Sequence, residues 1–169
     1  MKFKTSIHLF SFSQELFRRE LSSPKPLTLH VDPGYLSTLP SERWSAHGRW
    51  DRIRGAHPAL CQLCPDGETV LIVFLTSRWR LGALEVASSA KLQGGLRQWH
   101  DKESYLAPGP QYCLAPIGSL IEASREDRTH GGGRCYLDED EWARILAHLY
   151  AGEDQGPLNS FYPRGPELN

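Results

Sequence analysis

The sequence lacks a long hydrophobic run and an excess of either charge, and each absence excludes a class of protein. No stretch approaches the roughly 18 apolar residues that span a bilayer. The 19 Lys and Arg residues nearly balance the 20 Asp and Glu residues, and the formal net charge of -1 argues against a generic polyanion binder. The N-terminal segment is a poor signal peptide, because His8 interrupts its apolar stretch and no small-residue cleavage site follows. We therefore expect a cytoplasmic protein with reduced thiols and no membrane partner.

Cysteine is also scarce, and only one pair has the spacing of metal ligands. The chain has four cysteines, of which Cys61 and Cys64 are separated by two residues. A structural zinc site usually needs a second close pair, and Cys113 and Cys135 do not form one. The sequence therefore predicts free thiols and no cofactor. A metal site of His57, Cys61 and Cys64 is the alternative.

Length and composition indicate one folded domain. The chain has 169 residues, of which 40% are hydrophobic and 23% charged, which is ordinary for a globular protein that needs no disulfide or metal to fold. We expect a single α+β domain over residues 1–152, built on a small curved mixed sheet or a pseudobarrel with a few flanking helices. Proline and glycine recur in residues 153–169, which predicts a loose C-terminal tail.

Two segments have helical patterns. Ser13 can cap a short helix over Gln14–Leu21. The stronger pattern is Glu139–Ala151, where Trp142 lies on an apolar stripe at helical spacing. Asp138 at the cap and Glu141 three residues later form a capping-box pattern.

The strand predictions rest on alternation and on β-branched residues. Asp32-Pro33-Gly34 and Pro65-Asp66-Gly67 have turn chemistry, whereas Tyr35–Pro65 has no clear period and is predicted to be a loop that is functional or contains short hidden elements. The segment Thr69–Thr76 is rich in β-branched residues and apolar on both faces, and it is predicted to be a central buried strand. Four further strands are predicted at Lys2–Phe12, at Leu27–Val31, at Leu81–Ala87 and within Tyr112–Leu120.

Arginine beside tryptophan is the pattern most suggestive of a ligand. The basic residues comprise 14 Arg and 5 Lys, and arginine offers a planar fork of donors that suits phosphates and base edges. Indole faces stack on nucleobases while neighbouring guanidinium groups hold phosphates. Such clusters occur in three places in the chain. The candidate ligand-binding residues are Arg78, Trp79, Arg80, Trp50, Trp99 and Tyr105.

A family resemblance points the same way. The run Thr69–Thr76, a basic turn and then Gly82-Ala-Leu-Glu-Val86 resemble a piece of the PUA-like superfamily, which includes the EVE, YTH and ASCH domains. The likeness covers Thr69–Val86. It implies a pseudobarrel that binds RNA or modified DNA, with a flipped base held among aromatic side chains. The lysine and glutamate pattern of the ASCH-like amidohydrolases is not found here, so the resemblance does not carry that activity over.

The sequence therefore favours a nucleic-acid-binding module that reads a modified or flipped base, and it leaves open whether the protein is an enzyme. One alternative is a small metal-independent nuclease or nucleoside hydrolase. His47, His100 and Glu85 would be its acid and base candidates. Another is a protein-binding immunity or adaptor protein, with which the acidic run Asp138–Glu141 and the near-zero net charge are compatible.

Overall fold

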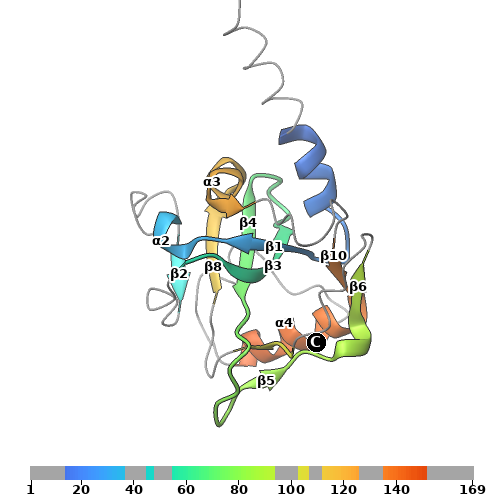
Figure 1. Cartoon of the computed structure of the whole chain (residues 1–169). Coiled ribbons are helices and arrows are strands. Elements are labelled where there is room, and N and C mark those ends of the chain that lie inside the picture. Colours follow the sequence, from blue (N-terminus) through green and yellow to red (C-terminus); the bar gives the residue numbers. More distant parts are fainter. Residues whose placement is uncertain are drawn as a thin grey trace, which may run out of the picture.

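A computed structural model describes residues 14–36, 45–47, 55–93, 103–106, 112–125 and 135–151. Its elements confirm the α+β class (Figure 1). The helical elements are residues 14–21, α2 (Pro33–Leu36), the 3-10 turn η3 (Ser88–Ala90), α3 (Ile117–Ala123) and α4 (Glu139–Ala151). The strands are β1 (Leu27–Val31), β2 (Ser45–His47), β3 (His57–Leu63), β4 (Thr69–Phe74), β5 (Leu84–Glu85), β6 (Lys91–Gln93), β7 (Tyr105–Leu106), β8 (Tyr112–Pro116), β9 (Ser124–Arg125) and β10 (Cys135–Leu137).

The larger sheet has the strand order β2-β8-β4-β3-β1-β10-β6, with β9 added beside β1. β5 and β7 form a separate two-stranded sheet. Every strand pair in the described residues is antiparallel, so the expected mixed sheet is not observed there. The strand order ends at β2 and β6, so the described part of the sheet does not close into the barrel that was the alternative expectation.

The sheet is buried on both faces. Along β4, Leu71 and Val73 belong to one buried cluster, which includes the apolar stripe of α4. Val70 and Ile72 belong to a second cluster, which includes residues of α3 and the end of helix 14–21. Successive strand residues point to opposite faces, so β4 divides the interior into two layers. In Figure 1, α4 lies below the sheet and α3 and helix 14–21 lie above it.

Several predicted elements are confirmed with their bounds. Residues 14–21 are helical, and α4 and β1 match the predicted ranges. The predicted buried strand is β4, whose residues after Thr69 are all buried. The turn before it is also confirmed, because Gly67 has a φ of 75°, where glycine avoids a steric cost.

Other predictions need correction. The segment without a clear period contains β2 and β3, which place His47 and His57 in strands rather than in loops. The predicted turn at Asp32 instead starts α2, where the Gly34 amide donates to Asp32 Oδ1 at 2.9 Å. The predicted strand Leu81–Ala87 shrinks to the two residues of β5. The predicted strand Lys2–Phe12 lies outside the described residues.

None of the helices in the described ranges combines the length and the apolar character that a transmembrane helix requires.

Candidate functional site

The segment between β4 and β5, here called the 77–83 loop, carries the most exposed large apolar side chains that the structure describes. Trp79 is 62% exposed and Leu81 is 86% exposed. The flanking Arg78 and Arg80 are exposed as well. The turn closes through Gly82, whose φ is 89°, and through a hydrogen bond from the Ala83 amide to the Arg80 carbonyl at 2.9 Å. The loop therefore exposes an indole to solvent, next in sequence to two exposed arginines.

Both ends of the 77–83 loop are attached to β7. Before the loop, Thr76 and Tyr105 exchange two backbone hydrogen bonds, of 2.9 Å and 2.8 Å. After the loop, Glu85 pairs with the same Tyr105 in the two-stranded sheet. The Arg78 amide also donates to Thr76 Oγ1 at 3.1 Å. The loop base is thus fixed by strand pairing, while its tip extends into solvent.

Five polar residues gather at this base, and we call them the β7 polar group: Glu85, Lys91, Glu103, Ser104 and Tyr105. Lys91 Nζ donates to Ser104 Oγ at 2.9 Å, and these residues are only 4% and 7% exposed. Tyr105 Oη donates to Glu103 Oε2 at 2.7 Å. Three consecutive residues, Glu103, Ser104 and Tyr105, therefore take part in two side-chain hydrogen bonds, one of which reaches Lys91 on β6.

The electrostatics of the β7 polar group shift two pKa values in opposite directions. Burial lowers the pKa of Lys91 below its ordinary 10.5, although the negative charges of Glu85 and Glu103 oppose this shift. The hydrogen bond to Glu103 raises the pKa of Tyr105 to about 12, with burial and the charges of Glu103 and Glu85 adding to the rise. Perturbed titratable groups that lie together are a common feature of functional sites.

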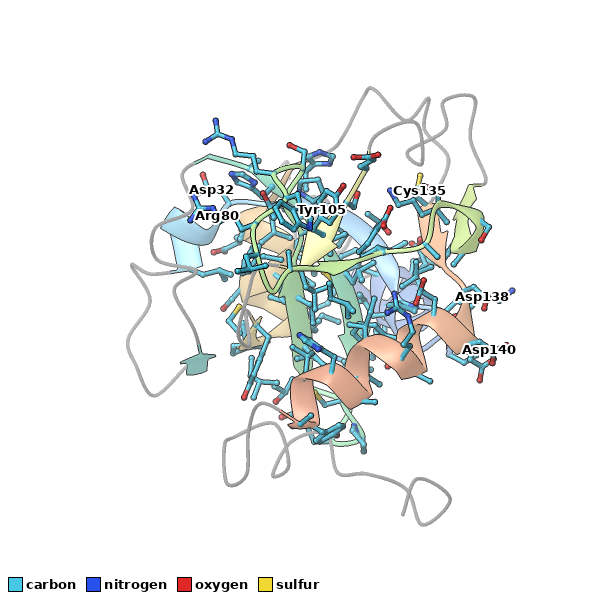
Figure 2. The ribbon with its side chains drawn as sticks, turned by 90° about the horizontal axis from the view of Figure 1, so that it is seen from below. Asp32, Arg80, Tyr105, Cys135, Asp138 and Asp140 are labelled. Atoms are coloured by element: carbon cyan, nitrogen blue, oxygen red, sulfur yellow. The ribbon has the colours of Figure 1, made fainter. Side chains whose placement is uncertain are left out.

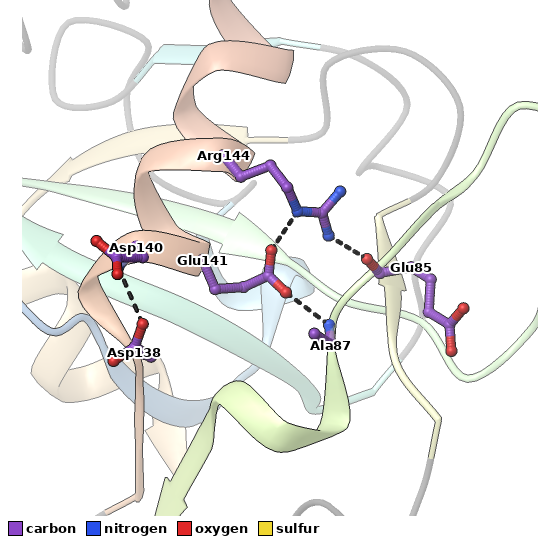
Figure 3. A network of polar contacts seen from close by, with 6 residues as sticks. All are labelled: Glu85, Ala87, Asp138, Asp140, Glu141 and Arg144. Atoms are coloured by element: carbon purple, nitrogen blue, oxygen red, sulfur yellow. Dashed lines mark hydrogen bonds and ion pairs between the residues drawn. The ribbon is translucent and has the colours of Figure 1, made fainter.

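Helix α4 fixes the chain where it leaves the loop (Figure 3). Glu141 is 7% exposed, and its Oε2 accepts a hydrogen bond from the Ala87 amide at 2.8 Å. Arg144 Nε donates to the other oxygen of Glu141. Arg144 Nη2 donates to the Glu85 carbonyl at 2.6 Å. Side chains one turn apart on α4 thus hold the backbone on both sides of Val86.

The acidic run at the start of α4 is partly used inside the molecule. Asp138 Oδ2 accepts the Asp140 amide at 3.1 Å, so Asp138 caps the helix as predicted. Glu141 contacts Ala87 and Arg144 instead, so the capping box is replaced by a tertiary contact. Figure 2 shows Asp138 and Asp140 together at the start of α4, with Arg80 and Tyr105 elsewhere in that view.

The structure brings part of the predicted ligand site together. Arg78, Trp79 and Arg80 lie on the 77–83 loop, Tyr105 anchors both of its ends, and Glu85 faces Tyr105. Three predicted residues lie outside the described ranges, namely Trp50, Trp99 and His100. His47 belongs to β2, which pairs with β8 rather than with the loop. Trp142 is 3% exposed and its indole N–H donates to Gln62 Oε1 at 2.7 Å, as expected of a core residue.

The alternative metal site of His57, Cys61 and Cys64 is not assembled. Cys61 lies in β3 and Cys64 lies just beyond its end, and the two cysteines belong to different buried clusters. Burial raises the pKa of both thiols, that of Cys64 to about 12. Within the described residues, no three His, Cys, Asp or Glu side chains are placed to hold a metal ion.

Sequence reasoning missed the buried pair of Lys91 and Ser104. The two residues are separated by 13 positions in a segment whose pattern is ambiguous between helix and strand. A lysine at the start of a three-residue strand carries no local sign of burial. Only the pairing of β6 with β10 and of β7 with β5 brings the two side chains together.

Comparisons with known proteins add no relative to this description. No protein-family model matches the chain, and neither a curated protein nor a solved structure matches it. The functional interpretation therefore rests on the geometry of the 77–83 loop and of the β7 polar group.

Proposed function

We propose that the protein binds single-stranded nucleic acid through the 77–83 loop. The observation that carries the proposal is Trp79, which is 62% exposed between two exposed arginines. Burying a large apolar side chain typically stabilises a fold by about 1.5–3 kcal/mol, and this fold forgoes that gain at Trp79. An exposed indole flanked by cations suits an unpaired base whose neighbouring phosphates are held by arginine.

The anchored base of the loop supports the same proposal. Binding costs less when the backbone of the binding segment is already ordered. Here both ends of the loop pair with Tyr105, so ordering on binding is confined to the tip and its side chains. The resemblance of Thr69–Val86 to PUA-like domains implies a base held among aromatic side chains, and in this proposal Trp79 is the residue that stacks on it.

The test is a binding titration with labelled single-stranded RNA and DNA oligonucleotides. Stacking of one base contributes about 1–3 kcal/mol, so Trp79→Ala should raise Kd by about 5- to 150-fold, whereas Trp79→Phe should retain part of the affinity. Arg78→Ala/Arg80→Ala should weaken binding and reduce the slope of log K against log salt by about 1.4. An equal Kd for wild type and Trp79→Ala would overturn the proposal.

A matched control separates local contacts from overall charge. Arg19 and Lys25 are exposed on or just after helix 14–21, away from the loop in sequence. Arg19→Ala/Lys25→Ala removes the same formal charge as the double arginine variant. If the loop arginines contact the bound strand, the Kd and the salt slope of this control variant should stay closer to those of wild type. If only the overall charge of the protein matters, the two double variants should change equally.

A second candidate function is a metal-independent nuclease, which one observation favours. Glu85 is the one of the three predicted acid and base residues whose side chain is described, and its charge acts on both Lys91 and Tyr105 at the loop base. A carboxylate beside a bound strand can act as a general base. Cleavage of single-stranded RNA in the presence of a chelator, lost in Glu85→Gln with binding retained, would support this function. Intact RNA would exclude it.

A further inference from the structure

The contact between Lys91 and Ser104 places an amine beside a hydroxyl group away from bulk water. Lys91 begins β6 and Ser104 immediately precedes β7, and their Nζ and Oγ atoms are 2.9 Å apart. Both residues are more than nine-tenths buried. A hydroxyl is a weak nucleophile until a neighbouring base accepts its proton, and a desolvated lysine is one of the groups that serve as this base.

We propose that Ser104 is a nucleophilic serine and that Lys91 is its general base. The class of substrate is an activated ester of a carboxylic or phosphonic acid, in which a carbonyl carbon or a phosphorus atom accepts the hydroxyl oxygen. The proposal does not rest on nucleic-acid binding by the 77–83 loop, since it concerns different side chains.

The step balances without a cofactor. The Ser104 hydroxyl proton passes to the neutral amine of Lys91 as Oγ forms a bond to the carbon or phosphorus atom. The bond from that atom to the leaving group breaks, and the leaving group departs with the bonding electron pair. Lys91 then holds the proton and returns it to the leaving group or to solvent. The product is an ester of Ser104. In its hydrolysis Lys91 accepts a proton from water, the water oxygen forms a bond to the carbon or phosphorus atom, and Ser104 Oγ leaves and takes the proton back from Lys91.

Burial and the neighbouring carboxylates act on the pKa of Lys91 in opposite directions, and burial is the larger effect. Burial lowers the pKa of Lys91, which favours the form that accepts a proton. Two carboxylates oppose the shift, Glu85 from β5 and Glu103 from the approach to β7. Glu103 also accepts a hydrogen bond from Tyr105. The backbone holds Ser104 in place, because its carbonyl accepts the Val86 amide at 2.9 Å.

The experiment treats the full chain with a fluorophosphonate probe and locates the adduct by peptide mass spectrometry. We expect an adduct on Ser104 that is absent from Ser104→Ala. Exposed Ser77 is the internal control, because the 77–83 loop that contains it has no lysine. General-base catalysis is typically worth roughly 100-fold or more, so Lys91→Met should slow labelling by about that factor. Acetylation of Ser104 by p-nitrophenyl acetate should likewise be faster in wild type than in Lys91→Met, and it should be absent from Ser104→Ala.

The pH profile separates a base from a residue that only packs against Ser104. Labelling of wild type should rise with pH to a plateau whose midpoint lies below the ordinary lysine pKa of 10.5, whereas Lys91→Met and Lys91→Gln should lose that midpoint. An unlabelled Ser104 in folded wild type would overturn the proposal. So would equal labelling rates of Ser104 in wild type and in a Lys91 variant with a native circular dichroism spectrum. Trp79→Ala should label as wild type does, which makes this test independent of nucleic-acid binding.

Discussion

Replacing Glu141 tests the contact by which α4 holds the loop base. Glu141→Ala removes the acceptor for the Ala87 amide and for Arg144 Nε. A hydrogen bond to a charged group is worth about 1.5–3 kcal/mol, and this value applies to Ala87 because Glu141 is 7% exposed. The Arg144 side chain is 48% exposed, so water can replace its contact with Glu141. The loss of that contact therefore adds at most about 1 kcal/mol to the destabilisation.

The sum is a loss of about 1.5–4 kcal/mol in the free energy of unfolding. For a domain of this size each kcal/mol corresponds to roughly 2–4 °C in Tm, so a loss near the middle of that range lowers Tm by about 6–12 °C. Chemical denaturation followed by circular dichroism gives the free energy, and calorimetry gives Tm. Glu141→Gln keeps an acceptor for Ala87 and should lose less than Glu141→Ala.

The matched control is Glu139→Ala, which removes a carboxylate from the same turn of α4 but at an exposed position. Helix-dipole effects at an exposed end are worth about 0.3–1 kcal/mol, so this variant should be close to wild type. If both variants lose the same stability, the dipole explains the effect and the contact with Ala87 does not. A loss below about 0.5 kcal/mol in Glu141→Ala would also refute the reasoning.

Three further predictions concern stability. Leu71→Ala empties part of the core beneath β4, where Leu71 is fully buried, and should cost about 2–5 kcal/mol by denaturant unfolding; a loss below 1 kcal/mol would contradict the assignment of β4 as the central strand. Burial alone would raise the pKa of Asp66, but hydrogen bonds from Thr69 and Glu68 lower it overall. The stability that Asp66 contributes is therefore present above its unfolded pKa near 3.8 and is lost as pH falls through its folded pKa. Asp66→Asn should remove part of this acid dependence, and an unchanged acid limb would count against it. Lys91 releases its proton at lower pH in the folded chain than in the unfolded chain, where its pKa is 10.5. As pH rises from the folded pKa towards 10.5, the free energy of unfolding of wild type should therefore rise relative to that of Lys91→Met. A fall in this difference would show that folding raises the pKa of Lys91.

Local pattern was sufficient where one face of an element is buried or where a strand is apolar throughout. Helix 14–21, β1, β4 and α4 were predicted with their ranges or nearly so. β3 was missed because Ala59, Leu60 and Cys61 are all buried, so the strand shows no alternation. Its interrupting Pro58 and Gln62 made the segment look irregular, although Gln62 is a buried partner of Trp142.

The loop base could not be predicted because its contacts are tertiary. Leu81 is apolar and was predicted to be in a strand, yet it is 86% exposed because the turn at Gly82 precedes β5. Two successive strands joined by a turn are typical of a hairpin, but β4 and β5 do not pair with each other. β4 instead pairs with β3 and β8, and β5 pairs with β7. Sequence therefore identified Trp79 as the residue to test, but not the group beneath it.

The most direct test of nucleic-acid binding by the 77–83 loop is ultraviolet cross-linking of a single-stranded oligonucleotide, with the attached peptide identified by mass spectrometry. The proposal predicts a nucleotide cross-linked to the peptide that contains Trp79, with a yield that falls as salt rises and is reduced in Arg78→Ala/Arg80→Ala. Cross-links confined to other peptides, or a Trp79 peptide equally labelled in that double variant, would contradict it.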